Sequence, residues 1–154
     1  MGDVYCGGWR SSPAGSNLEA RSCVQVDTGD FGATFGVEVR NVGKSQVTVA
    51  ALVKYVADQT TNCPDWSDPL RGIRIDPGGH WYSPLGQCSV SGLEGKQFQA
   101  AAYAVEDPNG ATDPKLGGVK YSINVRLWTD GQVTCRYEDG SQGSCDPWKY
   151  VPGS

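Results

Sequence analysis

Apolar and polar residues alternate along most of this chain. The clearest case is segment 119–127, where every second residue is apolar and lysine, serine, asparagine and arginine fill the positions between. Side chains of a strand point alternately to opposite faces, so this pattern predicts a strand with one buried face. Segments 23–27, 35–40, 47–55 and 97–105 show the same period. No segment has the i, i+3, i+4 spacing of an amphipathic helix, so we expect very little helix.

Turn-forming residues separate these segments. Four segments contain residues that adopt turn conformations or whose side chains hydrogen-bond to their own backbone. They are NVGKS at 41–45, PGG at 77–79, DPNG at 107–110 and DG at 130–131. Short alternating strands joined by such turns are typical of antiparallel sandwiches. We therefore expect an all-β fold, an immunoglobulin-like β-sandwich of seven or eight mainly antiparallel strands.

The chain length of 154 residues fits one domain. Residues 2–19 are rich in Gly and Ser and show no strand or helix period. We expect an extended N-terminal arm over residues 1–19, a single β-sandwich over 20–150 and a tail over 151–154. The apolar share is 38%, and 21 Gly with 9 Pro indicate many turns. Covalent links would help such a chain to fold.

Cysteines supply those links. No C-x-x-C motif occurs and His80 is the single histidine, which excludes the common zinc layouts. We predict three disulfides and an extracellular location, because disulfides persist in oxidising compartments. The residues MGDVY at the start lack the features of an export signal, so we expect a signal to have been removed. The six cysteines are Cys6, Cys23, Cys63, Cys88, Cys135 and Cys145.

Sequence alone ranks the possible pairings without deciding among them. One pair would flank a short turn-rich segment, and a second would bracket residues 71–82. The remaining pair would tie the arm to the first strand and, in the chain-entropy model, would stabilise the fold by about 3 kcal/mol. We expect the bridges to brace loops and the arm rather than to join two sheets through the core. The favoured pairs are Cys135 with Cys145, Cys63 with Cys88 and, by remainder, Cys6 with Cys23.

Charge and hydropathy exclude two classes of partner. The net charge is −4 and no run of Lys or Arg occurs, whereas nucleic-acid binding requires a concentrated basic surface. No apolar stretch approaches the roughly 20 residues that span a bilayer. We expect neither a nucleic-acid partner nor a membrane span.

Catalytic sets are not apparent. His80 follows a turn, and no G-x-S-x-G motif accompanies it, so a plain turn histidine is the favoured interpretation. An even number of cysteines leaves no obvious free thiol. The acidic pairs lie in expected loops, where acids usually form turns. We therefore predict no enzyme and no cofactor. These pairs are Asp65 with Asp68, Asp107 with Asp113 and Glu138 with Asp139.

One acidic loop has a second interpretation. Asp107, Asn109 and Asp113 place oxygen side chains around a glycine, which loosely matches a calcium loop. The full ligand series and the closing bidentate glutamate of an EF-hand are missing, and the same residues form ordinary turns. Calcium binding there stays open.

Aromatic residues give the main indication of binding. Five Trp and seven Tyr are many for this length, and Trp66 lies in a loop between acids and prolines. Such a Trp suits a sugar or protein partner, or it packs over a neighbouring disulfide. Trp9 and Arg10 are residue types favoured at interfaces and lie in the arm, which is either a binding strand or disordered. Trp81 and Tyr82 complete the candidate binding set, although Trp81 also suits the core.

Two sequence motifs resemble those of a known family. The sequence VEVRNVG at 37–43, followed by VTV at 47–49, resembles the strand–turn–strand motif of bacterial immunoglobulin-like sandwiches. The sequence IRIDPG at 73–78 resembles the motif with which a strand of these sandwiches passes into a turn. The likeness covers residues 21–128 and implies architecture, not activity. In size, cysteine usage and N-terminal arm, the chain is also similar to small secreted bacterial proteins, including adaptor subunits of extracellular toxin particles.

These observations favour a secreted, non-enzymatic protein-binding module or adaptor of an extracellular complex. The expected contacts are the N-terminal arm and the aromatic loops, with another extracellular protein as partner. Two alternatives remain open, a carbohydrate-binding module that takes a glycan and a secreted protease inhibitor whose loops are braced by disulfides.

Overall fold

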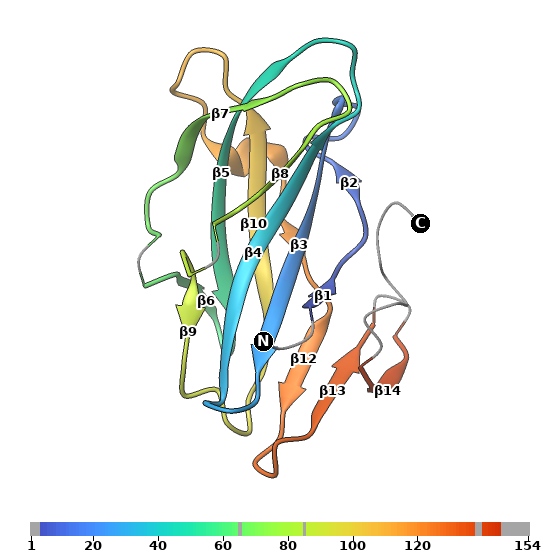
Figure 1. The fold of residues 1–154 in the computed structure, drawn as a ribbon, viewed down its shortest axis with the longest axis vertical. Helices are drawn as coiled ribbons and strands as arrows, with labels where there is room; N and C mark the ends of the chain where they lie inside the picture. The colour runs from blue at the N-terminus through green and yellow to red at the C-terminus, as the bar shows by residue number, and fades with distance from the viewer. Residues whose placement is uncertain (1–3, 65, 85, 138–139, 146–154) are drawn as a thin grey trace.

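The computed structural model describes residues 4–64, 66–84, 86–137 and 140–145. Within these residues the chain forms fourteen strands and one short 3-10 helix, and the strands build two antiparallel sheets that pack as a sandwich (Figure 1). The all-β fold, the two-sheet sandwich and the three disulfides predicted from the sequence are confirmed.

The first sheet has two long strands at its centre, with short strands paired along their outer sides. The ten-residue strands β3 and β4 pair over their whole length. The sheet comprises β1 (Val4–Cys6), β2 (Arg10–Ser11), β3 (Leu18–Asp27), β4 (Gly32–Asn41), β8 (His80–Tyr82) and β9 (Ser89–Val90).

The second sheet is built on the pairing of β5 with β10, each ten residues long. The 3-10 helix η1 (Pro114–Gly117) begins after Asp113, whose side chain accepts a hydrogen bond from the Lys115 amide. The sheet comprises β5 (Val47–Val56), β6 (Thr60–Asn62), β7 (Leu70–Ile75), β10 (Gln97–Glu106), β11 (Lys120–Tyr121), β12 (Asn124–Leu127), β13 (Val133–Arg136) and β14 (Gln142–Ser144).

Alternation along the long strands produces the core. In β4, Phe35, Val37 and Val39 are buried between the sheets, as their period predicts. The ring of Phe35 meets Phe98 of β10 edge to face at 5.8 Å, so aromatic packing joins the two layers. The small residues of β10 let another segment approach closely, as expected. Gly117 of η1 lies so close to β10 that a Cβ at this position would be 1.9 Å from the Ala104 carbonyl oxygen.

Segment 119–127 is not the single strand that the sequence predicts. β11 and β12 both pair with β10, but their registers differ by one residue, which places a bulge between Tyr121 and Asn124. The Ser122 hydroxyl accepts a hydrogen bond from the Ala100 amide there. A one-residue shift exchanges the two faces of a strand. As a result Ile123 is buried, whereas Tyr121 is 47% exposed.

The favoured disulfide pairs are the ones that form: Cys6–Cys23, Cys63–Cys88 and Cys135–Cys145. Two of them stay within one sheet. The Cys63–Cys88 bridge, however, links the segment after β6 of the second sheet to the segment before β9 of the first. Both residues are almost fully buried in the core cluster. The expectation that no bridge joins the sheets through the core was therefore wrong for this pair.

The segment predicted as an N-terminal arm is extended and runs along β3. β1 pairs with the second half of β3, and β2 pairs with its beginning, so Cys6 faces Cys23 and Arg10 faces Ala20. β1 and β2 thus form an edge of the first sheet, whereas Leu18 and Glu19, which were predicted as part of the arm, already belong to β3. In the described part of the chain no helix has the length and apolar character needed to cross a membrane.

Candidate functional site

The outer face of the first sheet carries a cluster of charged and aromatic side chains. Alternate residues of β3 and β4 point away from the core, and among them are Arg21, Glu38 and Arg40. The N-terminal segment supplies Trp9, and β8 supplies His80 and Tyr82 at the other side of β4. We call this set, together with Glu19 of β3, the outer-face cluster.

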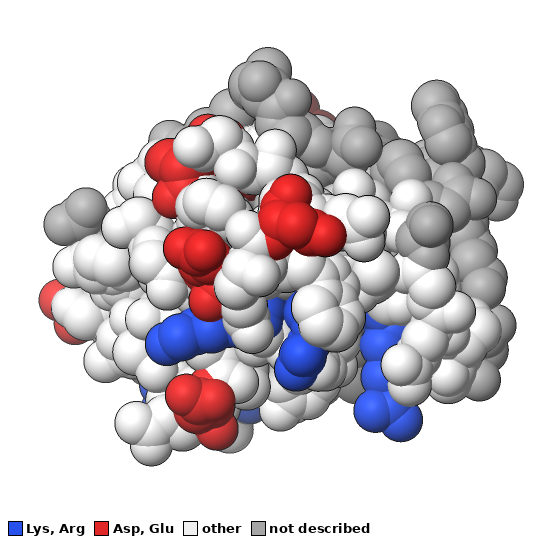
Figure 2. All heavy atoms as spheres, turned by 90° about the horizontal axis from the view of Figure 1, so that it is seen from below, with Lys and Arg blue, Asp and Glu red and all other residues white. Residues whose placement is uncertain are grey.

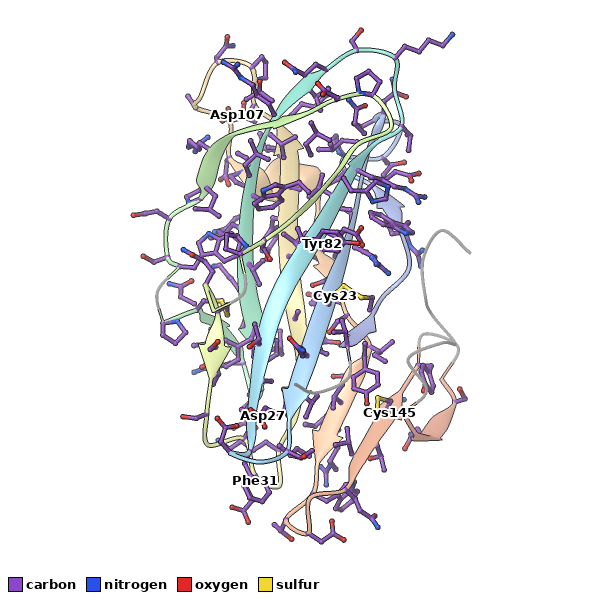
Figure 3. All side chains as sticks on the ribbon, viewed as in Figure 1. Cys23, Asp27, Phe31, Tyr82, Asp107 and Cys145 are labelled. Atoms are coloured by element: carbon purple, nitrogen blue, oxygen red, sulfur yellow. A yellow bond between two sulfur atoms is a disulfide. The ribbon has the colours of Figure 1, made fainter. Side chains whose placement is uncertain are left out.

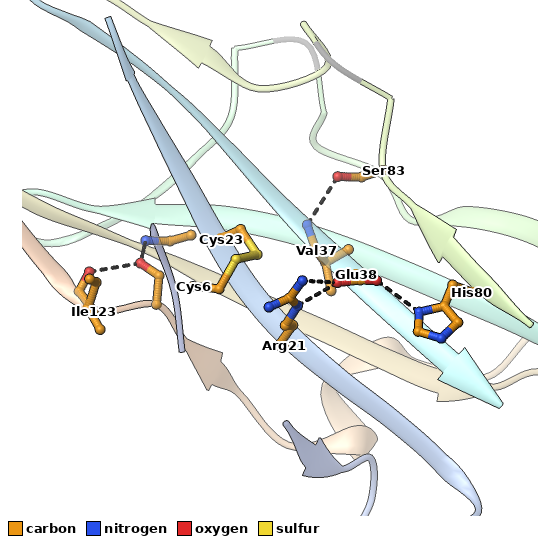
Figure 4. Close-up of a disulfide and its surroundings, with 10 residues drawn as sticks. Cys6, Arg21, Cys23, Val37, Glu38, His80, Ser83 and Ile123 are labelled. Carbon is orange, nitrogen blue, oxygen red and sulfur yellow. Dashed lines mark hydrogen bonds and ion pairs between the residues drawn. A yellow bond between two sulfur atoms is a disulfide. The ribbon is translucent and has the colours of Figure 1, made fainter. Parts of the chain in front are cut away.

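Glu38 is the centre of the cluster. Only 1% of Glu38 is exposed, and its Oε1 accepts hydrogen bonds from the Nε and Nη2 atoms of Arg21, which is 8% exposed (Figure 4). The other oxygen, Oε2, lies 2.9 Å from Nδ1 of His80. The Tyr82 hydroxyl also donates to this carboxylate, and this hydrogen bond, with burial, raises the pKa of Tyr82 above its ordinary value.

Trp9 lies over this network. The guanidinium carbon of Arg40 is 4.1 Å from the Trp9 ring centroid and that of Arg21 is 4.9 Å away, both within cation–π range. The ring of His80 meets Trp9 edge to face at 5.9 Å. Arg40 is held from its other side by an ion pair with Glu19 at 2.6 Å. The N-terminal segment is thus fixed to β3, β4 and β8 by one indole ring.

A groove of ≈ 400 Å³ runs beside the cluster. Its floor is the Cys6–Cys23 disulfide and Gly36, and its rim includes Val4 and Tyr82. Gly36 has no side chain to fill the groove. A Cβ at this position would lie 2.8 Å from the Ser83 hydroxyl oxygen. Figure 3 labels Cys23 of β3 and Tyr82 of β8, the strands that pair with β4 on its two sides. Val4 is 45% exposed and Tyr82 is 63% exposed.

The structure sorts the predicted binding residues into two groups. Trp9 and Tyr82 belong to the outer-face cluster, and Arg10 donates a hydrogen bond to the Trp9 carbonyl from the neighbouring position. Trp81 faces inward and packs against the core. Trp66 is 2% exposed within the same core cluster as the Cys63–Cys88 bridge. The interpretation of Trp66 as a surface contact was wrong, and core packing beside a disulfide is what occurs.

Arg21 and Glu38 were missed by the sequence analysis. Both occupy polar positions of alternating strands, where a solvent-facing side chain is the ordinary expectation. They are buried because Trp9 and the β8 residues cover them, a contact that no local pattern indicates. The pairing register of the two strands could have indicated this ion pair, since Arg21 and Glu38 face each other across β3 and β4.

The acidic loop that suggested calcium has a structural role. Asp107 lies at the end of the sandwich opposite the turn that contains Phe31 (Figure 3). Its Oδ1 accepts the Thr112 amide and its Oδ2 pairs with Arg71 at 2.9 Å. These hydrogen bonds, the Thr112 amide first, lower the pKa of Asp107 despite its burial. Among the residues that the structure describes, no group of three or more His, Cys, Asp or Glu side chains is placed to hold a metal.

Two of the acidic pairs lie wholly or partly outside the described residues. Asp65 of one pair and both Glu138 and Asp139 of the other are outside the part of the chain that the structure describes. His80 is oriented by Glu38 as a catalytic imidazole is oriented by its carboxylate. Ser83, the nearby hydroxyl, instead accepts a hydrogen bond from the Val37 amide. These hydrogen bonds fix the positions of His80 and Ser83.

Comparison with known proteins gives no family. No family model matches the chain, and neither does any curated protein. Two solved structures from Bacteroides uniformis are similar to it, a beta-glucuronidase with a TM-score of 0.38 at 9% identity and beta-glucuronidase 2 covalently bound to cyclophellitol-6-carboxylate aziridine, with a TM-score of 0.34 at 8% identity. Each match covers 80% of this chain and 13% of the other.

Proposed function

We propose that this domain is a non-enzymatic binding module of an extracellular complex, and that it holds a protein partner on the outer face of its first sheet. Three disulfides are typical of an oxidising compartment, and secretion is part of the proposal. The proposed role is that of an adaptor, in line with the likeness of the chain in size, cysteine usage and N-terminal arm to small secreted bacterial proteins that include adaptor subunits of extracellular toxin particles. The observation that carries it is the groove between Val4 and Tyr82.

The groove has the composition of an interface core. Its rim carries exposed apolar surface, since Val4 is 45% and Tyr82 63% exposed, and its floor is a disulfide. Aromatic and arginine side chains concentrate at protein interfaces, and anchors work best where polar groups nearby are already paired. Arg21 and Glu38, which form an ion pair with each other, line the groove, and His80 is bonded to Glu38. A partner would bury the apolar part without having to compensate a buried lone charge.

The N-terminal segment takes a supporting part in this proposal. It contributes Val4 to the rim and Trp9 to the cluster while paired to β3. Its exposed outer side therefore belongs to the same surface as Tyr82. Trp66, being buried, has no part in the contact.

Two point variants test the proposal better than removal of residues 2–19, which would take away β1, β2 and the first two residues of β3. The domain, immobilised, is used to capture proteins from the culture medium of its producing organism, and each captured protein is purified and titrated by calorimetry. Tyr82→Ala and Val4→Lys are expected to weaken its binding by about 30-fold or more, the effect of losing a hot spot of about 2 kcal/mol.

Tyr121→Ala is the matched control, because Tyr121 is 47% exposed on the second sheet. It is expected to leave the affinity unchanged. Circular dichroism confirms that each variant remains folded. Equal binding by the wild type, Tyr82→Ala and Val4→Lys would overturn the proposed surface.

A further inference from the structure

A second hollow lies on the outer face of the second sheet, apart from the groove. Three neighbouring strands, β12, β13 and β14, and the start of β10 form it. Arg126 of β12 stands opposite Thr134 of β13 and Gln97 of β10, and the next row brings Asn124, Arg136 and Gln142 into line. The hollow has a volume of ≈ 530 Å³. We call it the arginine pocket, lined by Gln97, Asn124, Arg126, Thr134, Arg136 and Gln142 with Trp128 at its edge.

Strand alternation explains why polar side chains gather there. The residues between them, Val125, Leu127 and Cys135, are at most 3% exposed and point into the core. Their neighbours on each strand must therefore point outward. The polar rows are thus a consequence of three strands in register, and two arginines of neighbouring strands come to share one face.

The arginine pocket is a basic site on an acidic protein. The net charge of the chain is −4, yet no carboxylate of the described residues forms an ion pair with Arg126 or Arg136. Figure 2 shows basic side chains in a row across the end of the molecule that carries the β12–β13 turn, with acidic side chains to either side. Two guanidinium groups without a carboxylate partner among the described residues favour an anionic ligand.

Trp128 supplies a fixed aromatic surface beside these charges. Its indole Nε1 donates to the Thr134 hydroxyl at 2.9 Å, and the Arg126 guanidinium lies 4.9 Å from its ring centroid. The side chain remains 41% exposed. An exposed ring held in place loses little conformational entropy on binding, and the C–H face of a sugar packs well on such a ring.

We propose that the arginine pocket binds a saccharide that carries carboxylate groups. A guanidinium fork matches a carboxylate with two parallel hydrogen bonds. Gln97, Asn124 and Gln142 each offer an amide donor and an acceptor, which suits hydroxyl groups. A sugar acid combines several hydroxyls with one carboxylate and an apolar ring face. An acidic peptide has the carboxylates with few hydroxyls, so it uses less of what the pocket offers.

This site is independent of the proposed protein contact, because Tyr82 and Val4 line the groove and not the arginine pocket. The probe is a purified alginate oligosaccharide, titrated by calorimetry into the folded full chain at low salt with EDTA. Saturable binding is expected. The same oligosaccharide with its carboxyl groups reduced to alcohols is expected to bind at least tenfold more weakly.

Variants locate the binding. Arg136→Gln and Trp128→Ala are expected to weaken it about tenfold or more, whereas Arg74→Gln, an exposed arginine on β7, is expected to leave it unchanged. Arg126→Gln is a second charge variant, and near-ultraviolet circular dichroism verifies the fold of each. Three results would overturn the proposal: no binding of the oligosaccharide, binding that survives Arg136→Gln and Arg126→Gln, or polyglutamate binding as tightly as the oligosaccharide.

Discussion

The guanidinium of Arg40 lies 4.1 Å from the centre of the Trp9 ring, and this contact fastens the N-terminal segment to a strand two places away in the sheet. β1 and β2 are only three and two residues long, too short to hold the segment firmly by backbone pairing alone. The Cys6–Cys23 disulfide fixes β1 to β3 covalently, and the Trp9 contact adds a second attachment for the residues that follow.

Trp9→Ala is expected to lower the free energy of unfolding by about 1 to 3 kcal/mol, since two cation–π contacts and the packing of one ring are lost. Urea denaturation measures the change. A double-mutant cycle with Arg40→Gln isolates the interaction between Trp9 and Arg40. A coupling energy near zero would show that their cation–π contact contributes nothing to stability.

Glu38→Gln removes the charged partner of an arginine that is 8% exposed. Loss of one member of a buried pair typically costs about 3 to 5 kcal/mol, because the other charge stays buried. Glu19→Gln is the matched control: its pair with Arg40 is more exposed, and the expected cost is about 0 to 1 kcal/mol. Equal costs in denaturant titrations would mean that burial does not strengthen the Arg21–Glu38 pair.

The three disulfides are expected to differ in their contribution to stability. Their sequence separations of 25, 17 and 10 residues predict about 3 to 4 kcal/mol for Cys63–Cys88 and roughly 2 to 3 kcal/mol for Cys135–Cys145 from chain entropy. The first bridge also joins the two sheets inside the core, so its removal leaves a cavity. Thermal unfolding of the two double Ala variants should place the Cys63/Cys88 variant lower, and the reverse order would contradict the buried inter-sheet bridge.

Tyr82 is expected to ionise at a pH above its ordinary pKa of 10.0, because its hydroxyl donates to the Glu38 carboxylate. A raised folded-state pKa stabilises the fold below the unfolded pKa, and this contribution is lost as the pH rises through the folded value. Ultraviolet titration of wild type and Tyr82→Phe should therefore differ by a component above pH 10.0. In Glu38→Gln the component should move down, and a component that stays in place would exclude the carboxylate as its cause.

Much of the fold follows from local pattern, and the candidate site follows from it only in part. The alternation at 35–40 places Phe35 and Val37 correctly in the core. Trp66 shows the limit, because a loop tryptophan between acids and prolines has the same sequence whether it is exposed or buried. Its burial depends on the Cys63–Cys88 bridge and the two sheets that meet there.

The sequence predicts the long strands, the sandwich and the presence of three disulfides, because side-chain alternation, turn residues and cysteine spacing act over short stretches of chain. Where the two faces of a strand exchange, and which residues of different strands share a face, depends on the tertiary structure. The bulge beside Ser122 exposes Tyr121, and the register of β12 and β13 brings Asn124 and Arg136 together. Register depends on contacts between segments distant in sequence, and a shift of one residue reverses every side chain that follows.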